Sequence, residues 1–229
     1  IYFYNKTKNS KYLKPVELVL KKLCSKGIYD HIEGGVSRYT VDENWLIPHF
    51  EKMLYDNVQF VLLLAKFLKV KPDNYYFKKV KQTTNFIKIN FLTKETNLLG
   101  SAYDADSEGV EGKYYVYSYD ELKNIKDIEK FFNIKQEGNW EGKIILDEIN
   151  EPKDEIIEKL LNIRKKRKKP FFDKKNQLDL NCLWISSLIS LNSIIPNQGY
   201  LKTAEIFYQN IEKKFCTKTI FHSYSEEIS

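Results

Sequence analysis

An apolar segment at residues 58–65 is the feature that most constrains the fold. It reads VQFVLLLA, and as a helix it would be hydrophobic on almost every side, so it belongs in the interior of a protein. The ten residues before it, PHFEKMLYDN, bring a histidine, a tyrosine and several charged groups to the start of the same helix, which we expect at residues 48–69. Burying polar groups at the start of such a helix costs free energy unless they form hydrogen bonds or ion pairs, or bind a ligand.

The polar residues at this helix start have a regular spacing. His49, Lys52 and Asp56 follow i, i+3, i+7 and would share one helix face, which is suited to the wall of a ligand pocket. The alternative is an ordinary capped helix start, with Pro48 at the first helical position and Glu51 favoured by the helix dipole.

Helical periodicity also dominates the rest of the chain. Short turns between successive helices indicate antiparallel hairpins, and two longer excursions, 27–45 and 93–119, interrupt the series. The second excursion contains KYYVYS, whose alternation is typical of a strand. Besides 48–69, the expected helices are 11–26, 74–92, 154–169, 178–194 and 198–215, with a short one near 127–132.

Composition narrows the class of protein. The 229 residues are 42% hydrophobic, but no run approaches the ~18 apolar residues that a membrane span needs. The net charge of +6 is modest, and we interpret the basic run RKKRKK at 164–169 as the solvated end of a helix stopped by Pro170 rather than a nucleic-acid patch. The unpaired Cys24, Cys182 and Cys216 fit a reducing compartment, and we expect a cytoplasmic location.

Two polar segments are candidate sites. The loop at 104–112 begins like a calcium-binding EF-hand loop, but Tyr115 stands where the bidentate glutamate of such a loop belongs. The carboxylates of the loop could instead act as acid and base on a sugar, or they could merely stabilise a turn. Residues 27–45 combine an arginine, acidic groups and aromatic rings, which suits a sugar or a carboxylate. Gly34 and Gly35 within it favour a tight backbone path over a phosphate cradle.

Four blocks carry a resemblance to a known family: GIYDHIEGGVSRYTVDENWLIPHF at 27–50, GSAYDADSEGVEGKYYVY at 100–117, GNWEGKIIL at 138–146 and RKKRKKPFFDKKNQLDLN at 164–181. In this order they closely resemble the thioredoxin-domain-containing family that includes spermatogenesis-associated protein 20. The last block matches only in part, since Phe172 and Leu180 replace an aspartate and a tryptophan of the family.

The resemblance implies an all-α fold, an (α/α) six-hairpin barrel of the glycosidase-like type with short β excursions at one rim. Family members also carry a thioredoxin-like domain, which we expect to be absent here because no C-x-x-C pair is present. The chain opens on Ile1 and stops at Ser229, so we expect residues 1–229 to be the first half of one barrel domain, without a separate second domain.

The resemblance further implies a carbohydrate-active enzyme domain, epimerase-like or hydrolase-like, with a polar pocket at the barrel rim. In this hypothesis His49 is a general acid or base, and Asp56, Asp104 and Asp106 position the substrate or share proton transfer. The loop at 104–112 would then form part of the site. The expected substrate-binding residues are Arg38, Tyr39, Asp42, Trp45, Glu51, Lys52, Tyr55, Glu108, Asp173 and Asn181.

The alternative is a non-catalytic ligand-binding or protein-binding domain that partners a thioredoxin-like redox domain in the parent chain. In both hypotheses we expect a small-molecule ligand such as a carbohydrate, with no metal, no other cofactor, no nucleic acid and no membrane as partners.

Overall fold

The computed structural model describes residues 1–196 and 198–225. Their contacts group them into two compact units. Unit 1 comprises Ile1–Leu13, Met53–Tyr103 and Phe172–Ser229, and unit 2 comprises Lys14–Lys52 and Asp104–Phe171. Each unit therefore brings together segments that are far apart in the sequence.

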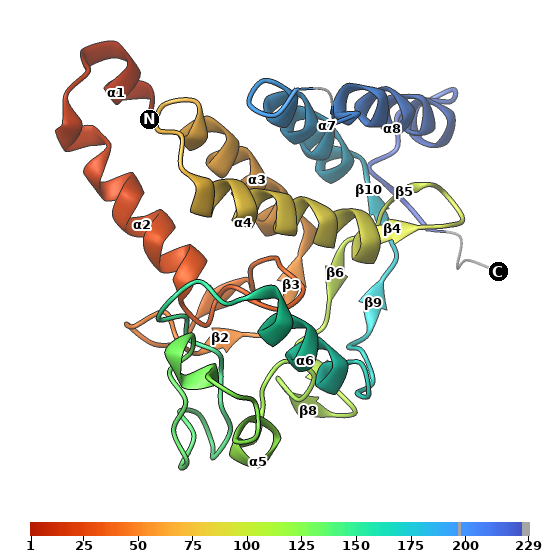
Figure 1. Ribbon diagram of the computed structural model, residues 1–229. Helices are drawn as coiled ribbons and strands as arrows, with labels where there is room; N and C mark the ends of the chain where they lie inside the picture. The colour runs from red at the N-terminus through yellow and green to blue at the C-terminus, as the bar shows by residue number, and fades with distance from the viewer. Residues whose placement is uncertain (197, 226–229) are drawn as a thin grey trace. The chain divides into compact units, whose positions relative to one another are not determined.

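The long helices of unit 1 pack in a connected series. Helix α7 contacts both α3 and α8, and α3 also contacts α4, which lies beside it in Figure 1. The helices are α3 (Leu54–Leu68), α4 (Asn74–Phe86), α7 (Leu178–Asn192) and α8 (Tyr200–Phe215).

The apolar segment 58–65 forms the buried centre of α3, as predicted. Val61, Leu64 and Ala65 are fully buried. The hydroxyl group of Ser187 on α7 donates a hydrogen bond to the carbonyl oxygen of Val58 at 3.1 Å, so α7 lies directly against this helix. Burial on several sides explains why the segment has no polar face.

Shorter elements complete unit 1. Its strands form two-residue antiparallel pairs, β4 with β5, β6 with β9 and β10 with β11. The elements are α1 (Tyr2–Thr7), η1 (Ser10–Tyr12), the π-helical turn η2 (Ile87–Phe91), β4 (Leu92–Thr93), β5 (Leu98–Leu99), β6 (Ala102–Tyr103), β9 (Phe172–Asp173), β10 (Asn176–Gln177) and β11 (Ser223–Tyr224).

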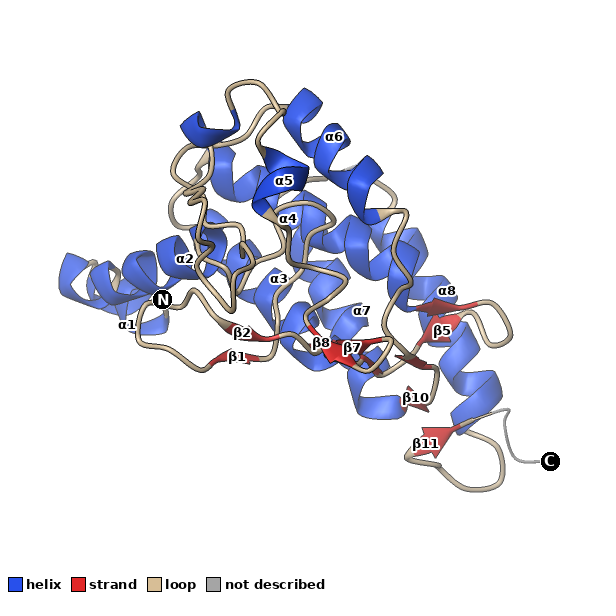
Figure 2. Ribbon diagram, turned by 90° about the horizontal axis from the view of Figure 1, so that it is seen from below, coloured by secondary structure: helices blue, strands red, loops and turns tan. Residues whose placement is uncertain are grey.

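Unit 2 has shorter helices and more irregular chain. Two antiparallel pairs, β1 with β2 and β7 with β8, are visible in Figure 2. The elements are α2 (Lys14–Ser25), β1 (Tyr39–Thr40), β2 (Pro48–His49), β7 (Asp106–Ser107), β8 (Val110–Glu111), α5 (Tyr119–Leu122), the 3₁₀ turn η3 (Ile128–Lys130) and α6 (Asp154–Arg164).

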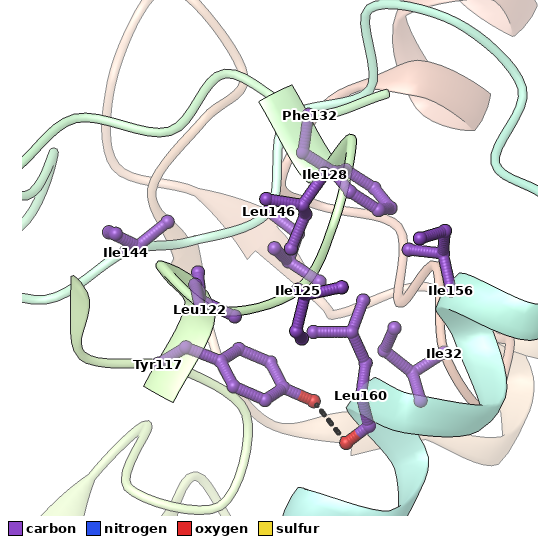
Figure 3. Packing of buried hydrophobic residues seen from close by; sticks show 10 residues of the cluster. All are labelled: Ile32, Tyr117, Leu122, Ile125, Ile128, Phe132, Ile144, Leu146, Ile156 and Leu160. Carbon is purple, nitrogen blue, oxygen red and sulfur yellow. Dashed lines mark hydrogen bonds between the residues drawn. The ribbon is translucent and has the colours of Figure 1, made fainter. Parts of the chain in front are cut away.

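An apolar core holds unit 2 together (Figure 3). The fully buried Tyr117 contributes its ring to this core, and its hydroxyl group donates to the carbonyl oxygen of Leu160 on α6 at 3.1 Å. The cluster consists of Ile32, Tyr117, Leu122, Ile125, Ile128, Phe132, Ile144, Leu146, Ile156 and Leu160.

The fold class is confirmed: the regular structure of the described chain is mainly helical, and its strands are only two residues long. The β-prone excursion at 93–119 does contain strands, although its KYYVYS segment forms mainly turns. Within the described part of the chain, no helix has the length and apolar character to cross a membrane.

The helix expected at 48–69 begins later than predicted. Helix α3 starts at Leu54, whereas Pro48–His49 is strand β2 and Lys52–Met53 is strand β3. The backbone N–H of Arg38 donates to the carbonyl oxygen of Glu51 at 3.0 Å, so pairing with a distant segment uses backbone groups that a helix would need. His49, Lys52 and Asp56 therefore do not share a helix face, and the predicted pocket wall and the alternative cap at Pro48 are both wrong.

The other expected long helices are confirmed with shorter ends, and the short one expected near 127–132 is only the 3₁₀ turn η3. Residues 154–169 illustrate the difference, because α6 ends at Arg164. The interpretation of the basic run as a solvated helix end is wrong for Arg164, whose side chain is 2% exposed. The positive φ angles of Gly34 (91°) and Gly35 (85°) confirm the predicted tight backbone path.

We predict that Asn181→Ala destabilises the protein by roughly 1–3 kcal/mol. The buried Asn181 side chain accepts a hydrogen bond from the N–H of Leu99 at 2.8 Å and donates to the carbonyl oxygens of Leu99 and Gln177 at 3.1 and 2.9 Å. Its removal takes away the acceptor of the buried Leu99 N–H, whereas the carbonyl oxygen of Leu99 keeps a hydrogen bond from Asn176 at 2.9 Å. Urea unfolding measures the loss.

The matched control is Ser186→Ala, at an exposed position of the same helix, with an expected change within about 0.5 kcal/mol. Equal effects of the two substitutions would contradict a structural role for Asn181.

Candidate functional site

A cluster of polar side chains gathers around His49 in unit 2. The pairing of β1 with β2 sets Tyr39 opposite His49, and the two rings stack with centroids 5.0 Å apart at 19°. Nδ1 of His49 lies 3.2 Å from Oε1 of Glu111, and Nε2 lies 3.4 Å from Oε2 of Glu51. Arg38 places Nη1 3.2 Å from the same oxygen of Glu51. We name these five residues the His49 cluster.

The His49 cluster is accessible to a ligand. The side chain of His49 is 30% exposed, and those of Arg38 and Glu111 are each 46% exposed. An imidazole exchanges protons near neutral pH, and flanking carboxylates fix the orientation of its ring. The arrangement can therefore donate or accept a proton at the surface of unit 2.

A tight hairpin delivers Glu111 to this cluster. Strands β7 and β8 are joined by Glu108 and Gly109, whose φ angles of 55° and 74° are those of a type I′ turn. At Gly112 a Cβ atom would lie 2.6 Å from the ring of Phe50, so only glycine fits there. The loop thus packs against the segment around His49, as expected, but that segment is extended rather than helical.

Two other carboxylates of the hairpin, those of Asp104 and Glu108, have local partners. Oδ1 of Asp104 accepts a hydrogen bond from the N–H of Asp106 at 3.3 Å, which is a turn interaction. Glu108 pairs with Lys113 at 2.8 Å. Asp104, Asp106 and Glu108 are all exposed, and their catalytic or binding roles stay predictions.

Asp42 and Trp45 lie in the turn between β1 and β2. The carboxylate of Asp42 accepts hydrogen bonds from the N–H groups of Asn44 at 2.9 Å and Ile47 at 2.6 Å. Trp45 has a φ angle of 64°, a left-handed conformation that is unusual for a bulky residue. Asp42 thereby fixes the turn that sets Tyr39 opposite His49.

Four predicted binding or catalytic residues belong to unit 1. Tyr55 and the half-buried Asp56 lie in the first turn of α3, and Asn181 is the buried backbone clamp described above. Asp173 accepts a hydrogen bond from the N–H of Lys175 at 3.0 Å. Asp173 and Asn181 therefore have structural partners, and their predicted binding roles stay predictions.

A second polar cluster in unit 2 is buried. Lys52 places Nζ 2.6 Å from Oδ2 of Asp30 and 2.9 Å from the carbonyl oxygen of Gly34. Nη1 of Arg164 lies 2.7 Å from both carboxylate oxygens of Asp30 and 3.3 Å from Glu33. The side chains of Asp30, Lys52 and Arg164 are 4%, 2% and 2% exposed. We name these three residues the Asp30 cluster.

The charges of the Asp30 cluster are fixed by their mutual attraction. Burial by itself would raise the pKa of Asp30, but the neighbouring Arg164 and Lys52 outweigh it and hold that pKa well below its usual range. Burial lowers the pKa of Lys52, and Asp30 opposes this effect. Asp30 is therefore a carboxylate at any physiological pH.

A small cavity adjoins the Asp30 cluster. Its volume is about 30 Å³, which is room for one or two water molecules and far too little for a sugar ring. Polar and apolar side chains share its wall, including those of His31, Ser37, Phe50, Tyr115 and the Asp30 cluster. The buried cluster is thus a structural centre rather than a ligand pocket.

Sequence reasoning missed the roles of two arginines from the basic run. Arg164 lies eight residues after Ile156 and four after Leu160, so it is on the buried face of α6. This spacing is visible in the sequence and could have predicted the burial of Arg164. Arg167 donates to the carbonyl oxygen of Tyr114 at 3.1 Å and to Oε1 of Glu121 at 2.8 Å. Both side chains hold unit 2 together.

Among the residues that the structure describes, no group of three histidine, cysteine, aspartate or glutamate side chains is placed to hold a metal ion.

Comparison with known sequences confirms the family resemblance. No protein-family model matches the chain. Spermatogenesis-associated protein 20 of Mus musculus is 34% identical over 112 residues, which is 46% of this chain and 14% of the mouse protein. The uncharacterized protein B0495.5 of Caenorhabditis elegans is 27% identical over 242 residues, 83% of this chain and 32% of that protein. The chain is homologous to both and spans only a fraction of their length.

Comparison with solved structures confirms the glycosidase-like fold. A family 76 glycoside hydrolase from a bovine Bacteroides thetaiotaomicron strain has a TM-score of 0.57 and 14% identity, covering 93% of this chain and 32% of that one. A family 76 mannosidase of Bacteroides thetaiotaomicron gives the same TM-score and identity and 41% coverage of its own chain. The chain therefore has the fold of carbohydrate enzymes, of the six-hairpin glycosidase-like type.

We predict that Asp30→Asn destabilises the protein by about 3–5 kcal/mol, because two buried cations lose their carboxylate. The ionised Asp30 contributes stability above its ordinary pKa of 3.8, and this contribution is lost as the pH falls toward its lower folded value. The difference in the free energy of unfolding between wild type and variant should therefore become smaller below about pH 3.8. Urea unfolding across acidic pH measures both effects.

The control is Asp120→Asn, whose side chain is 83% exposed and pairs with Lys123. It should change stability by less than about 0.5 kcal/mol. A loss for Asp30→Asn of the same small size would show that the Asp30 cluster does not hold unit 2.

Proposed function

We propose that this chain is part of a carbohydrate-active domain in which the His49 cluster receives a sugar and His49 transfers a proton. One observation carries the proposal: an accessible imidazole lies between the carboxylates of Glu51 and Glu111 and stacks on Tyr39. The shared fold with family 76 glycoside hydrolases supports a carbohydrate as the ligand class.

The residues of the cluster suit distinct roles in this proposal. His49 is the general acid or base, because its accessible ring nitrogens lie beside two carboxylates and an imidazole can both donate and accept a proton. Glu51 and Glu111 hold the ring and offer oxygens to sugar hydroxyl groups. Arg38, whose guanidinium lies 5.9 Å from the ring centroid of Tyr39, donates hydrogen bonds to the ligand.

The reaction class within this proposal is hydrolysis or epimerisation. Hydrolysis uses two carboxyl groups that flank the scissile bond, about 5–5.5 Å or 6.5–9.5 Å apart according to the stereochemistry. Epimerisation needs proton transfer at a carbon atom, for which an imidazole is suited. Asp104 and Asp106, which belong to the same unit as His49, are the further carboxylates that we propose for substrate positioning.

A second candidate function is a non-catalytic ligand-binding domain partnering a thioredoxin-like domain of the parent protein. The observation that favours it is the small size of the cavity beside the Asp30 cluster, about 30 Å³, which leaves the exposed His49 cluster as a surface rather than an enclosed reaction site. Both functions predict the same class of ligand, but only the first predicts that the ligand is converted to a product.

We predict that His49→Gln lowers turnover of a sugar substrate by about 10²–10⁴-fold, because it removes the group that transfers the proton. A thermal-shift screen of mono- and oligosaccharides on the full-length protein first identifies a ligand, and product formation is then measured. Because His49 is partly exposed, the variant should keep its melting temperature within a few degrees.

The matched control is Glu137→Gln, an exposed carboxylate outside the cluster, which should leave turnover unchanged. Sugar binding without turnover in the wild type would support the second function. The absence of any sugar-induced thermal shift would contradict both.

A further inference from the structure

The β7–β8 hairpin is part of a three-segment ribbon in unit 2. On one edge of residues 104–107, the carbonyl oxygen of Ala105 accepts a hydrogen bond from the N–H of Gly112 at 3.1 Å. On the other edge, the N–H of Asp104 donates to the carbonyl oxygen of Phe171 at 2.9 Å. Phe171 therefore lies along the edge of the hairpin that faces away from β8.

The segment that carries Phe171 runs antiparallel to β7. The hydroxyl group of Ser107 donates to the carbonyl oxygen of Lys168 at 2.6 Å, so three residues forward along one segment correspond to three residues back along the other. The adjoining strands β6 and β9 pair in the same register. This register sets Asp104 opposite Phe171.

The ribbon has an inner face and an outer face, because side chains alternate along extended chain. The inner face packs on the interior: Ala105 is 5% exposed and belongs to an apolar cluster with Phe50. Gly112, next to Ala105 across the hairpin, lies against the ring of Phe50 as well. The residues between these inner positions therefore belong to the outer face.

The outer face joins Phe171 to the His49 cluster. Asp106 and Glu111 are direct cross-strand partners, so their side chains share this face, and Glu111 reaches His49 from it at 3.2 Å. Asp104 is two residues before Asp106 and shares the face, as does Phe171 opposite it. Asp104 and Asp106 are exposed, and Phe171 is 70% exposed.

We propose that Phe171 is the platform for a second sugar ring, so that the site around His49 takes an oligosaccharide rather than a monosaccharide. Two strand spacings, about 10 Å in all, separate the segments of Glu111 and Phe171, and an oligosaccharide can bridge this distance. The inference rests on the proposed function and adds to it the size of the ligand and the residue that selects it.

The chemistry of the outer face suits a chain of sugars. The apolar face of an aromatic ring stacks on the C–H groups of a sugar, and the carboxylates of Asp104 and Asp106 accept hydrogen bonds from its hydroxyl groups. A protein partner fits less well, because the cores of protein interfaces are depleted in acidic residues. Tyr39, 47% exposed and stacked on His49, supplies a second aromatic ring at the other end of the site.

The test is calorimetric titration of the full-length protein with two sugar series. One series is mannose and its α-1,6-linked disaccharide and trisaccharide, and the other is glucose, cellobiose and cellotriose. In a series that binds, we expect the trisaccharide to bind about 3–10-fold more tightly than the monosaccharide. Equal affinities within such a series would overturn this inference and leave the proposed function standing, whereas no binding of any of the six sugars would overturn both.

Variants assign the preference to Phe171. Phe171→Ala should lower the ratio of trisaccharide to monosaccharide affinity by about 3–10-fold, and Phe171→Trp, which keeps an aromatic face, should retain the ratio. The matched control is Phe221→Ala, at a phenylalanine of unit 1 that is 48% exposed, and it should keep the wild-type ratio.

Two results with these variants would overturn the proposal. One is an equal change of the affinity ratio in Phe171→Ala and Phe221→Ala. The other is loss of self-association in Phe171→Ala, measured by sedimentation, without a change in the ratio, because a second copy of the chain would then be the partner of Phe171.

Discussion

The Asp30 cluster is the interaction on which the rest of unit 2 depends. One carboxylate pairs with Lys52, 22 residues away, and with Arg164, 134 residues away, so a single buried charge joins three distant segments. The net energy of a buried ion pair is small, because desolvation offsets the attraction, but loss of one partner is severe. An arrangement of these segments that separated Asp30 from either cation would leave a buried charge uncompensated.

The same cluster explains how the exposed site is built. Because Asp30 and Lys52 are 2.6 Å apart, the chain between them forms a closed loop, and this loop carries Arg38, Tyr39, His49 and Glu51. Within it, Asp42 fixes the turn that sets the register of β1 and β2. Residues buried for structural reasons thus determine which side chains meet at the surface, and Glu111 arrives from a separate hairpin whose turn geometry is equally fixed.

Local pattern was enough to predict some elements but not others. Residues 58–65 formed the buried helix that their composition indicated, since burial on all sides leaves a clear signature. Residues 48–53 have an equally helical spacing, yet they are extended. The N–H of Arg38 donates a hydrogen bond to the backbone carbonyl oxygen of Glu51, and Asp30 holds the side chain of Lys52. Arg164 sits in phase with buried Ile156 and Leu160, but its carboxylate partner cannot be identified from one sequence.

The two polar clusters differ in what chemistry they permit. In the Asp30 cluster every charge has a buried opposite charge at 2.6–2.7 Å, and the pKa of Asp30 is held too low for proton exchange near neutral pH. In the His49 cluster the contacts are longer, at 3.2–3.4 Å, and the imidazole is 30% exposed. A ligand can compete for such contacts without leaving a buried charge unpaired. Of these two clusters, the surface one is therefore accessible to a ligand, while the buried one fixes the loop that carries it.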